Sequence, residues 1–183
     1  MKKEIYVGIF GIIALILAFI FDSQILSIFS IFRAPILDTI MVQISYWSAW
    51  YFILFYILML FCIAKDIKTL KLACVALLIA EFFVLILKYG IGRERPVSMF
   101  MANGGSFPSG HATAVFAPFA TIWRRFNVFK YFWLVIAIII CFNRLYLGVH
   151  YPSDVVAGVL LGYFTGVFIE KKLKRSIEKF LIK

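Results

Sequence analysis

Charged residues are scarce in this sequence, and it has almost no extended polar stretch. Of the 183 residues, 15% are charged and 64% are hydrophobic, and the mean hydropathy is +0.99. A soluble globular domain is nearer a quarter charged and half apolar. Because the apolar residues also come in long runs, the sequence predicts an all-α polytopic membrane protein with one domain over residues 1–183. At about 20 residues per span there is room for roughly six transmembrane helices, with almost nothing left for a soluble domain.

Cysteines are also few, and their positions exclude the usual functions of this residue. All three lie inside apolar runs without the spacing of a metal site, so we interpret them as core residues: Cys62, Cys74 and Cys141. The net charge of +10 comes mostly from lysines and arginines that flank apolar runs. There they would face anionic lipid, so we expect membrane lipids and not nucleic acid as partners.

The apolar runs predict six membrane spans. No small-residue cleavage site follows the first run, so we expect an uncleaved signal-anchor helix. Glu81 lies near the middle of the third span, where we interpret it as a polar contact between spans, and Pro118 is expected to kink the fourth. The spans cover Ile5 to Phe21, Tyr46 to Ala64, Leu72 to Leu87, Ser109 to Trp123, Tyr131 to Leu147 and Ser153 to Ile169.

A less hydrophobic segment, Asp22 to Ser45, separates the first two spans. Apolar side chains such as Phe29, Phe32 and Ile36 recur in it at helical spacing, with polar residues such as Arg33 between them. This pattern predicts an amphipathic helix that lies along the extracytoplasmic membrane interface. The alternative is a ragged extension of the second span.

The lysines and arginines predict the orientation of the chain. With the N-terminus in the cytoplasm, fourteen of the nineteen fall on the cytoplasmic side, together with both termini. Two polar segments, Lys88 to His111 and Asn143 to Asp154, then emerge on the extracytoplasmic face. The cations at or near that face run against the charge bias, which indicates a role other than topology: Arg33, Lys88, Arg93, Arg95 and Arg144.

Each polar segment contains one of the chain's two histidines, His111 and His150. A cation close to lipid usually has an anionic partner. Lys88, Arg95 and Arg144 outnumber the carboxylates near them, so a bound anion would balance the site. The planar guanidinium of arginine suits phosphate oxygens in particular. Contact with a lipid headgroup explains any one of these cations alone, but not their combination with histidine.

The residues beside the histidines favour phosphate chemistry. Ser109 and Gly110 are suited to the start of a helix, where free N–H groups bind phosphate, and His111 follows in the first turn. His150 and Asp154 are four residues apart and share one face if they lie on a helical turn. An acidic partner holds an imidazole in one tautomer, and such a histidine can attack phosphorus to give a phosphohistidine.

Together these positions resemble the three-part motif of the type 2 phosphatidic acid phosphatase and vanadium haloperoxidase superfamily. The matching residues are Lys88-x6-Arg95-Pro96, Pro108-Ser109-Gly110-His111 and Arg144-x5-His150-x3-Asp154. The motif covers residues 88–154, and the six-span plan extends the resemblance over the whole chain. The family usually has Ser before the third-motif Arg, whereas this chain has Asn143. This departure affects one hydrogen bond and not the reaction, since Asn also donates and accepts.

The resemblance implies a role for each matching residue. His150 would be the nucleophile and Asp154 would orient it, while His111 would protonate the leaving oxygen and later activate water. No metal or other cofactor is implied. The phosphoryl oxygens would be held by Lys88, Arg95, Ser109, Gly110 and Arg144.

The resemblance therefore predicts a lipid phosphatase of the bacterial cytoplasmic (inner) membrane, whose substrate enters from the bilayer. We expect undecaprenyl pyrophosphate, because the chain is small and its loops are short. The alternative substrates are phosphatidylglycerol phosphate, lipid A 1-phosphate, phosphatidate and diacylglycerol pyrophosphate, and phosphate transfer to another lipid is a further variant. An anion transporter or channel that uses the cations for selectivity is an alternative of a different class, against which the His–Asp pair counts. The oligomeric state stays open.

Overall fold

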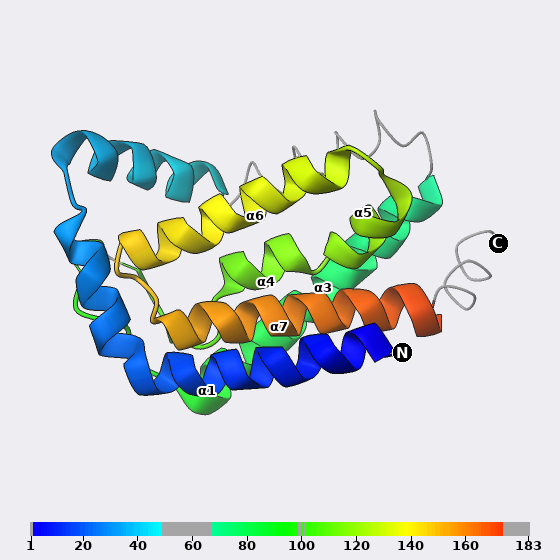
Figure 1. Cartoon of the computed structure of the whole chain (residues 1–183), viewed down its shortest axis with the longest axis horizontal. Helices are drawn as coiled ribbons and strands as arrows, with labels where there is room; N and C mark the ends of the chain where they lie inside the picture. The colour runs from blue at the N-terminus through cyan, green and yellow to red at the C-terminus, as the bar shows by residue number, and fades with distance from the viewer. Residues whose placement is uncertain (1, 49–66, 99, 101, 174–183) are drawn as a thin grey trace.

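The computed structural model describes residues 2–48, 67–98, 100 and 102–173, which form helices and no strand (Figure 1). The all-α class is therefore confirmed for this part of the chain. In chain order the elements are α1 (Lys2–Ile31), a helix over residues 35–48, α3 (Ile67–Ile91), α4 (Gly110–Phe116), α5 (Phe119–Arg125), α6 (Phe129–Tyr146), α7 (Pro152–Phe168) and the π-helix η1 (Ile169–Leu173).

Four stretches of the described chain are long and apolar enough to cross a membrane: Glu4–Ile31, Thr69–Ile91, Phe129–Tyr146 and Pro152–Lys171. They coincide with the first, third, fifth and sixth predicted spans. The second predicted span falls mainly on residues 49–66, outside the described residues. The fourth is divided into α4 and α5 by a turn at Ala117 and Pro118. The kink predicted at Pro118 is thus confirmed, because proline lacks the N–H and its ring clashes with the preceding turn.

The predicted single helix from Asp22 to Ser45 is wrong. α1 continues past Asp22 to Ile31, with a kink at Phe21, where φ is −109° and ψ is 18°. A new helix then begins at Pro35 after a short non-helical link. Proline disfavours helical geometry in the residue before it but is well tolerated in the first turn, so the helix breaks immediately before Pro35. Whether either half lies in the interface stays a prediction.

The helices place both polar segments at one end of the bundle. In Figure 1, α1 runs alongside α7, with the start of α1 and the end of α7 together at the right, while α4 lies between α7 and α6. The end of α6, the start of α7 and the start of α4 lie toward the opposite end. His111 and His150 therefore lie far from the N-terminus of the chain.

Glycines at every fourth position of α7 allow α4 to pack unusually close to it. A Cβ atom on Gly158 would lie 2.5 Å from the backbone carbonyl oxygen of Ser109. Cβ atoms on Gly162 and Gly166 would meet backbone carbonyl oxygens of α4 and the turn after it at still shorter distances. Small residues at this spacing are a common way for membrane helices to approach closely. The contact fixes the start of α4 against the start of α7.

The outer faces of the bundle are apolar. Phe10 on α1, Leu78 on α3 and Ile138 on α6 are 70%, 69% and 57% exposed. Trp133, by contrast, is buried and donates its indole N–H to the carbonyl oxygen of Val115 at 2.8 Å. Continuous apolar faces of this extent are stable against lipid rather than water. The chain is a membrane protein.

Candidate active site

A cavity of about 550 Å³ is lined by residues of both polar segments. Both histidines and three cations line it, together with Gly110. The remaining wall is largely apolar and comes in part from the 35–48 helix. The lining residues are Val42, Ser45, Tyr46, Lys88, Arg95, Phe100, Ala102, Asn103, Gly110, His111, Arg144, Leu147, Val149 and His150.

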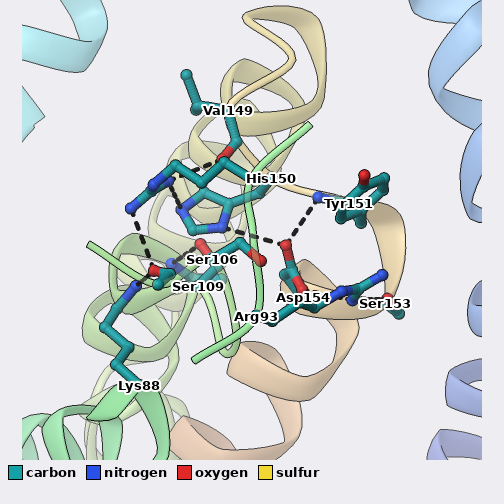
Figure 2. Close-up of polar contacts among 12 residues, drawn as sticks. Lys88, Arg93, Ser106, Ser109, Val149, His150, Tyr151, Ser153 and Asp154 are labelled. Atoms are coloured by element: carbon teal, nitrogen blue, oxygen red, sulfur yellow. Dashed lines mark hydrogen bonds and ion pairs between the residues drawn. The ribbon is translucent and has the colours of Figure 1, made fainter. Parts of the chain in front are cut away.

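His150 lies just before α7, and Asp154 lies in the first turn of that helix. The two were expected on one helical turn, but the helix begins only at Pro152, and the Asp154 side chain folds back toward His150. His150 Nδ1 and Asp154 Oδ2 are 3.5 Å apart, and the Tyr151 N–H donates to the same Oδ2 at 2.8 Å (Figure 2). Catalytic hydrogen bonds are often this long before substrate binds.

The tautomer of His150 follows from its other neighbour. Arg95 Nη1 lies 3.2 Å from His150 Nε2. A guanidinium can only donate, so Nε2 must be the unprotonated nitrogen of the neutral ring, and the proton lies on Nδ1, facing Asp154. Burial lowers the pKa of His150 to about 4, although Asp154 opposes this shift. At neutral pH the ring is therefore uncharged, with a lone pair on Nε2.

His111 enters the cavity from the first turn of α4. Its Nε2 lies 3.4 Å from Nη1 of Arg144, which comes from the last turn of α6 and is buried. Arg144 also donates to the amide oxygen of Asn143, while its Nε atom has no hydrogen-bond partner among the described residues. A buried guanidinium with an unused donor beside a cavity is suited to hold an anion.

Lys88 and Arg95 reach the site from α3 and from the segment after it. Lys88 Nζ donates to the carbonyl oxygen of Gly105 at 2.6 Å. Arg95 donates to the carbonyl oxygens of Gly104 at 3.0 Å and Val149 at 2.8 Å. The two cations therefore hold the 103–105 segment beside His150, and both also line the cavity.

Ser109 and Asn143 link the site to its surroundings. Ser109 is the N-cap of α4; its hydroxyl accepts the Ala112 N–H at 3.5 Å, and its own N–H donates to the Asp154 carbonyl oxygen at 2.9 Å. The Ser109 side chain is not part of the cavity lining, so its predicted contact with phosphate stays a prediction. Asn143 is fully buried and donates to the Met41 carbonyl oxygen at 2.6 Å, which ties the 35–48 helix to α6.

Two residues that the sequence analysis did not assign to the site, Arg93 and Asp22, connect to Asp154 without lining the cavity. Arg93 donates to Asp154 Oδ1 at 2.7 Å, and Asp22 of α1 forms an ion pair with Arg93 at 2.7 Å. The available signal was weak: Arg93 is an extra cation in the first polar segment, and Asp22 is the acidic residue that ends the first apolar run. Nothing in the sequence connects the two.

Glu81 and the cysteines occupy other positions. Glu81 lies on α3 near the start of α4: its Oε2 would be 3.7 Å from a Cβ atom built on Gly110, and its buried Oε1 has no hydrogen-bond partner among the described residues. Its predicted polar contact between spans stays a prediction. Cys74 and Cys141 are free thiols, and Cys62 lies outside the described residues.

Comparison with known proteins identifies the family. The family model described as PAP2 superfamily matches residues 69–177, more than half of the chain. This chain belongs to the PAP2 superfamily. The match spans α3 to α7 and all three parts of the motif, so the resemblance inferred from the motif residues is confirmed.

Curated relatives of this PAP2 protein match it over shorter stretches. An alignment of 89 positions with a lipid A 1-phosphatase of Rhizobium etli is 39% identical and covers 42% of this chain and 38% of that protein. An alignment of 66 positions with a putative undecaprenyl-diphosphatase of Escherichia coli is 38% identical and covers 33% of this chain and 31% of that protein. The matched part is thus well under half the length of these relatives.

Solved structures resemble the PAP2 protein over most of its length. Aquifex aeolicus LpxE superposes with a TM-score of 0.73 at 25% identity, covering 82% of this chain and 94% of that one. A PAP2 type phosphatidylglycerolphosphate phosphatase from Bacillus subtilis superposes with a TM-score of 0.76 at 23% identity, covering 93% and 95%. The fold of the described residues is that of this membrane family.

Proposed function

We propose that this PAP2 protein is a phosphatase that hydrolyses the terminal phosphate of a membrane lipid through a phosphohistidine at His150. The observation that carries the proposal is the single cavity lined by His111, His150, Lys88, Arg95 and Arg144. These side chains come from α3, the segment after it, α4, α6 and the segment before α7, and they supply a nucleophile, a second imidazole and three cations. Family membership and the phosphatase names of the relatives support the same reaction class.

The reaction would proceed in two steps. His150 Nε2 carries the lone pair and attacks phosphorus, while the bond from phosphorus to the lipid-side oxygen breaks and the imidazolium form of His111 gives that oxygen a proton and becomes neutral. Asp154 stabilises the positive charge that the His150 ring gains. In the second step His111 takes a proton from water, the water oxygen attacks phosphorus, and the bond from phosphorus to Nε2 breaks, which frees inorganic phosphate. Arg144, with its unused donor, would stabilise the phosphoryl oxygens in both transition states.

The apolar part of the cavity supports a lipid substrate. The same cavity that holds the charged residues is also lined by Val42 and Tyr46 of the 35–48 helix, Phe100 and Leu147. A lipid phosphate needs this combination, because its phosphate must reach the cations while its tail stays in an apolar environment. An exposed edge of this lining would allow the tail to remain in the bilayer.

Among lipid phosphates we propose undecaprenyl pyrophosphate as the preferred substrate. The E. coli relative is named a putative undecaprenyl-diphosphatase, and this chain has no large headgroup-binding segment among its described residues. Lipid A 1-phosphate is the second candidate, because the R. etli relative is a lipid A 1-phosphatase. Phosphatidylglycerol phosphate is a third candidate, supported only by the shared fold of the B. subtilis phosphatase.

We further propose that the cavity faces the extracytoplasmic side of the bacterial cytoplasmic membrane, that both termini are cytoplasmic, and that residues 46–64 and 109–123 complete six spans. The positive-inside rule supports this orientation, as does the position of the starts of α4 and α7, beside which the two histidines lie, toward the end of the bundle opposite the start of α1 (Figure 1). The residues of α1 beyond its kink at Phe21 would lie along the interface.

Phosphate release from a panel of purified lipid phosphates, in detergent with EDTA, tests the function. We expect release from undecaprenyl pyrophosphate to be fastest, and His150→Ala to abolish it. The matched control is Glu4→Gln, which removes a charge at the opposite end of α1 and should have no effect. Full activity of His150→Ala would refute the nucleophile, and anion flux across vesicles without phosphate release would favour a transporter instead.

A further inference from the structure

A continuous polar network runs from the predicted nucleophile to α1. Arg93 Nη1 donates to Asp154 Oδ1 at 2.7 Å and to the Ser153 hydroxyl at 2.7 Å. Arg93 Nη2 donates to Asp22 Oδ2 at 2.7 Å. Asp22 also accepts the Ser153 N–H at 2.8 Å and the Ser153 hydroxyl at 2.5 Å. His150, Asp154, Arg93 and Asp22 thus form one chain of contacts, part of which is visible in Figure 2.

The network is buried where it approaches His150. Asp154 and Ser153 are fully buried, and Asp22 is 6% exposed. The Arg93 guanidinium lies over the Tyr151 ring at 4.2 Å and near the Phe19 ring at 5.2 Å, so aromatic faces restrict its orientation. Charge-assisted hydrogen bonds in such an environment are strong and directional.

Each contact in the network removes a degree of freedom from Asp154. Its Oδ1 is held by Arg93, and its Oδ2 is held by the Tyr151 N–H. The carboxylate therefore cannot rotate about its Cβ–Cγ bond, and Oδ2 stays directed at His150 Nδ1. Asp22 does the same for Arg93 by holding the second guanidinium nitrogen.

Arg93 is also separated from the place where phosphate would bind. Lys88, Arg95 and Arg144 line the cavity, whereas Arg93 does not, and its Nη1 and Nη2 groups are directed at protein oxygens. A guanidinium used in this way supports another residue and does not contact substrate.

We propose that Arg93 and Asp22 are positioning residues that act on His150 through Asp154. For its kinetic test this inference rests on the proposed function. It gives α1, the helix most distant in sequence from the motif, a direct effect on the chemical step. It also gives a function to the kink at Phe21, which immediately precedes Asp22.

A double-mutant cycle tests the pathway through Asp154. Arg93→Ala should lower kcat by about 10–100-fold, the usual range for residues that orient a catalytic group, and should leave KM within about threefold. In an Asp154→Asn background the same change should lower kcat by less than about threefold, because the residue through which Arg93 acts is already impaired. Arg93→Lys should recover part of the activity, and Asp22→Asn should cost less than Arg93→Ala. Glu4→Gln, which removes a contact between α1 and η1 at the other end, is the control.

Two results would overturn the proposal: a raised KM with unchanged kcat, which would mean that Arg93 binds substrate, or equal losses in both backgrounds, which would mean a general structural role. If Arg93→Ala does not fold, Arg93→Lys and Asp22→Asn in the same cycle decide the question.

Nitrogen-15 NMR of the histidine rings gives a readout that needs no activity. We expect His150 in the wild type to be protonated at Nδ1. Arg93→Ala should shift and broaden the Nδ1 resonance, because Asp154 is then less firmly held against Nδ1, while Nε2 stays unprotonated beside Arg95 and Glu4→Gln changes neither resonance. Unchanged His150 resonances in Arg93→Ala would refute the proposal. If the wild type released no phosphate from any lipid, the proposed function would fail while this measurement still decided the positioning role.

Discussion

The close contact between α4 and α7 leads to a sharp prediction for Gly158→Ala. The added Cβ would lie 2.5 Å from the Ser109 carbonyl oxygen and 3.0 Å from the Ala112 Cβ, whereas carbon atoms pack best at about 3.5–4.0 Å. The start of α4 must therefore move away from α7 by about 1 Å. Overpacking of this kind costs about 1–3 kcal/mol, against a gain of about 1 kcal/mol in helix propensity, so we expect a net loss of up to about 2 kcal/mol.

The effect on activity should exceed the effect on stability. The same movement would lengthen the 2.9 Å hydrogen bond from the Ser109 N–H to the Asp154 carbonyl oxygen and shift His111 relative to His150. Because a displacement of about 1 Å between reacting groups can cost about 100-fold, we expect kcat to fall by about 10–100-fold. Thermal unfolding in detergent and phosphate release from undecaprenyl pyrophosphate measure the two effects.

A second glycine provides the control. A Cβ on Gly8 of α1 would lie 3.5 Å from the Phe164 ring, which is an ordinary contact, so Gly8→Ala should keep full activity and equal or better stability. Wild-type kcat in Gly158→Ala would refute the argument that the glycines of α7 set the geometry of the site.

Three further predictions follow from individual contacts. Burial lowers the pKa of His150 to about 4, below the 6.5 of an exposed histidine, so nitrogen-15 NMR should show a neutral ring at pH 6. The stability that depends on the neutral ring should be lost as the pH falls from 6.5 toward 4. A His150 titration midpoint of 6.5 or above would contradict this prediction. Asn143→Leu should lower the melting temperature and cost at least about tenfold in kcat, because the Met41 carbonyl and the Arg144 guanidinium each lose a buried partner. Asn143→Ser, which restores the family's usual residue, should keep kcat within about threefold. Equal effects of the two changes would contradict the role of Asn143 as a hydrogen-bonding partner of Arg144. Orthovanadate, which mimics the five-coordinate phosphorus of the transition state, should inhibit phosphate release competitively, and noncompetitive inhibition would place its site elsewhere.

The apolar runs and the motif residues were the parts of the sequence from which the fold and the site could be predicted best. Long apolar segments predicted four of the helices, and the break at Pro118 followed from proline chemistry alone. The motif in turn named the histidines and cations that line the cavity. His111 and His150 could be placed on one side of the membrane because the order of the predicted spans brings both polar segments to the same face.

The remaining features depend on contacts between distant segments. Asp22 and Arg93 are 71 residues apart, and no local pattern connects them. The break before Pro35 was missed because the apolar periodicity on both sides of it is helical, so the pattern alone suggested one continuous helix. The role of Asn143 could not be predicted in full either, since one of its partners, the Met41 carbonyl, is 102 residues away.

The most direct test of the proposed mechanism is to look for phosphate on His150 during turnover. Undecaprenyl pyrophosphate labelled in its terminal phosphate would be mixed with enzyme and quenched in alkali, in which phosphohistidine is stable, and the labelled peptide would be identified by mass spectrometry. We expect acid-labile label on His150 in the wild type, none in His150→Ala, and a slower approach to labelling in His111→Ala, because the leaving oxygen has lost its proton donor. Phosphate release without label on His150, or label on another residue, would contradict the proposed mechanism.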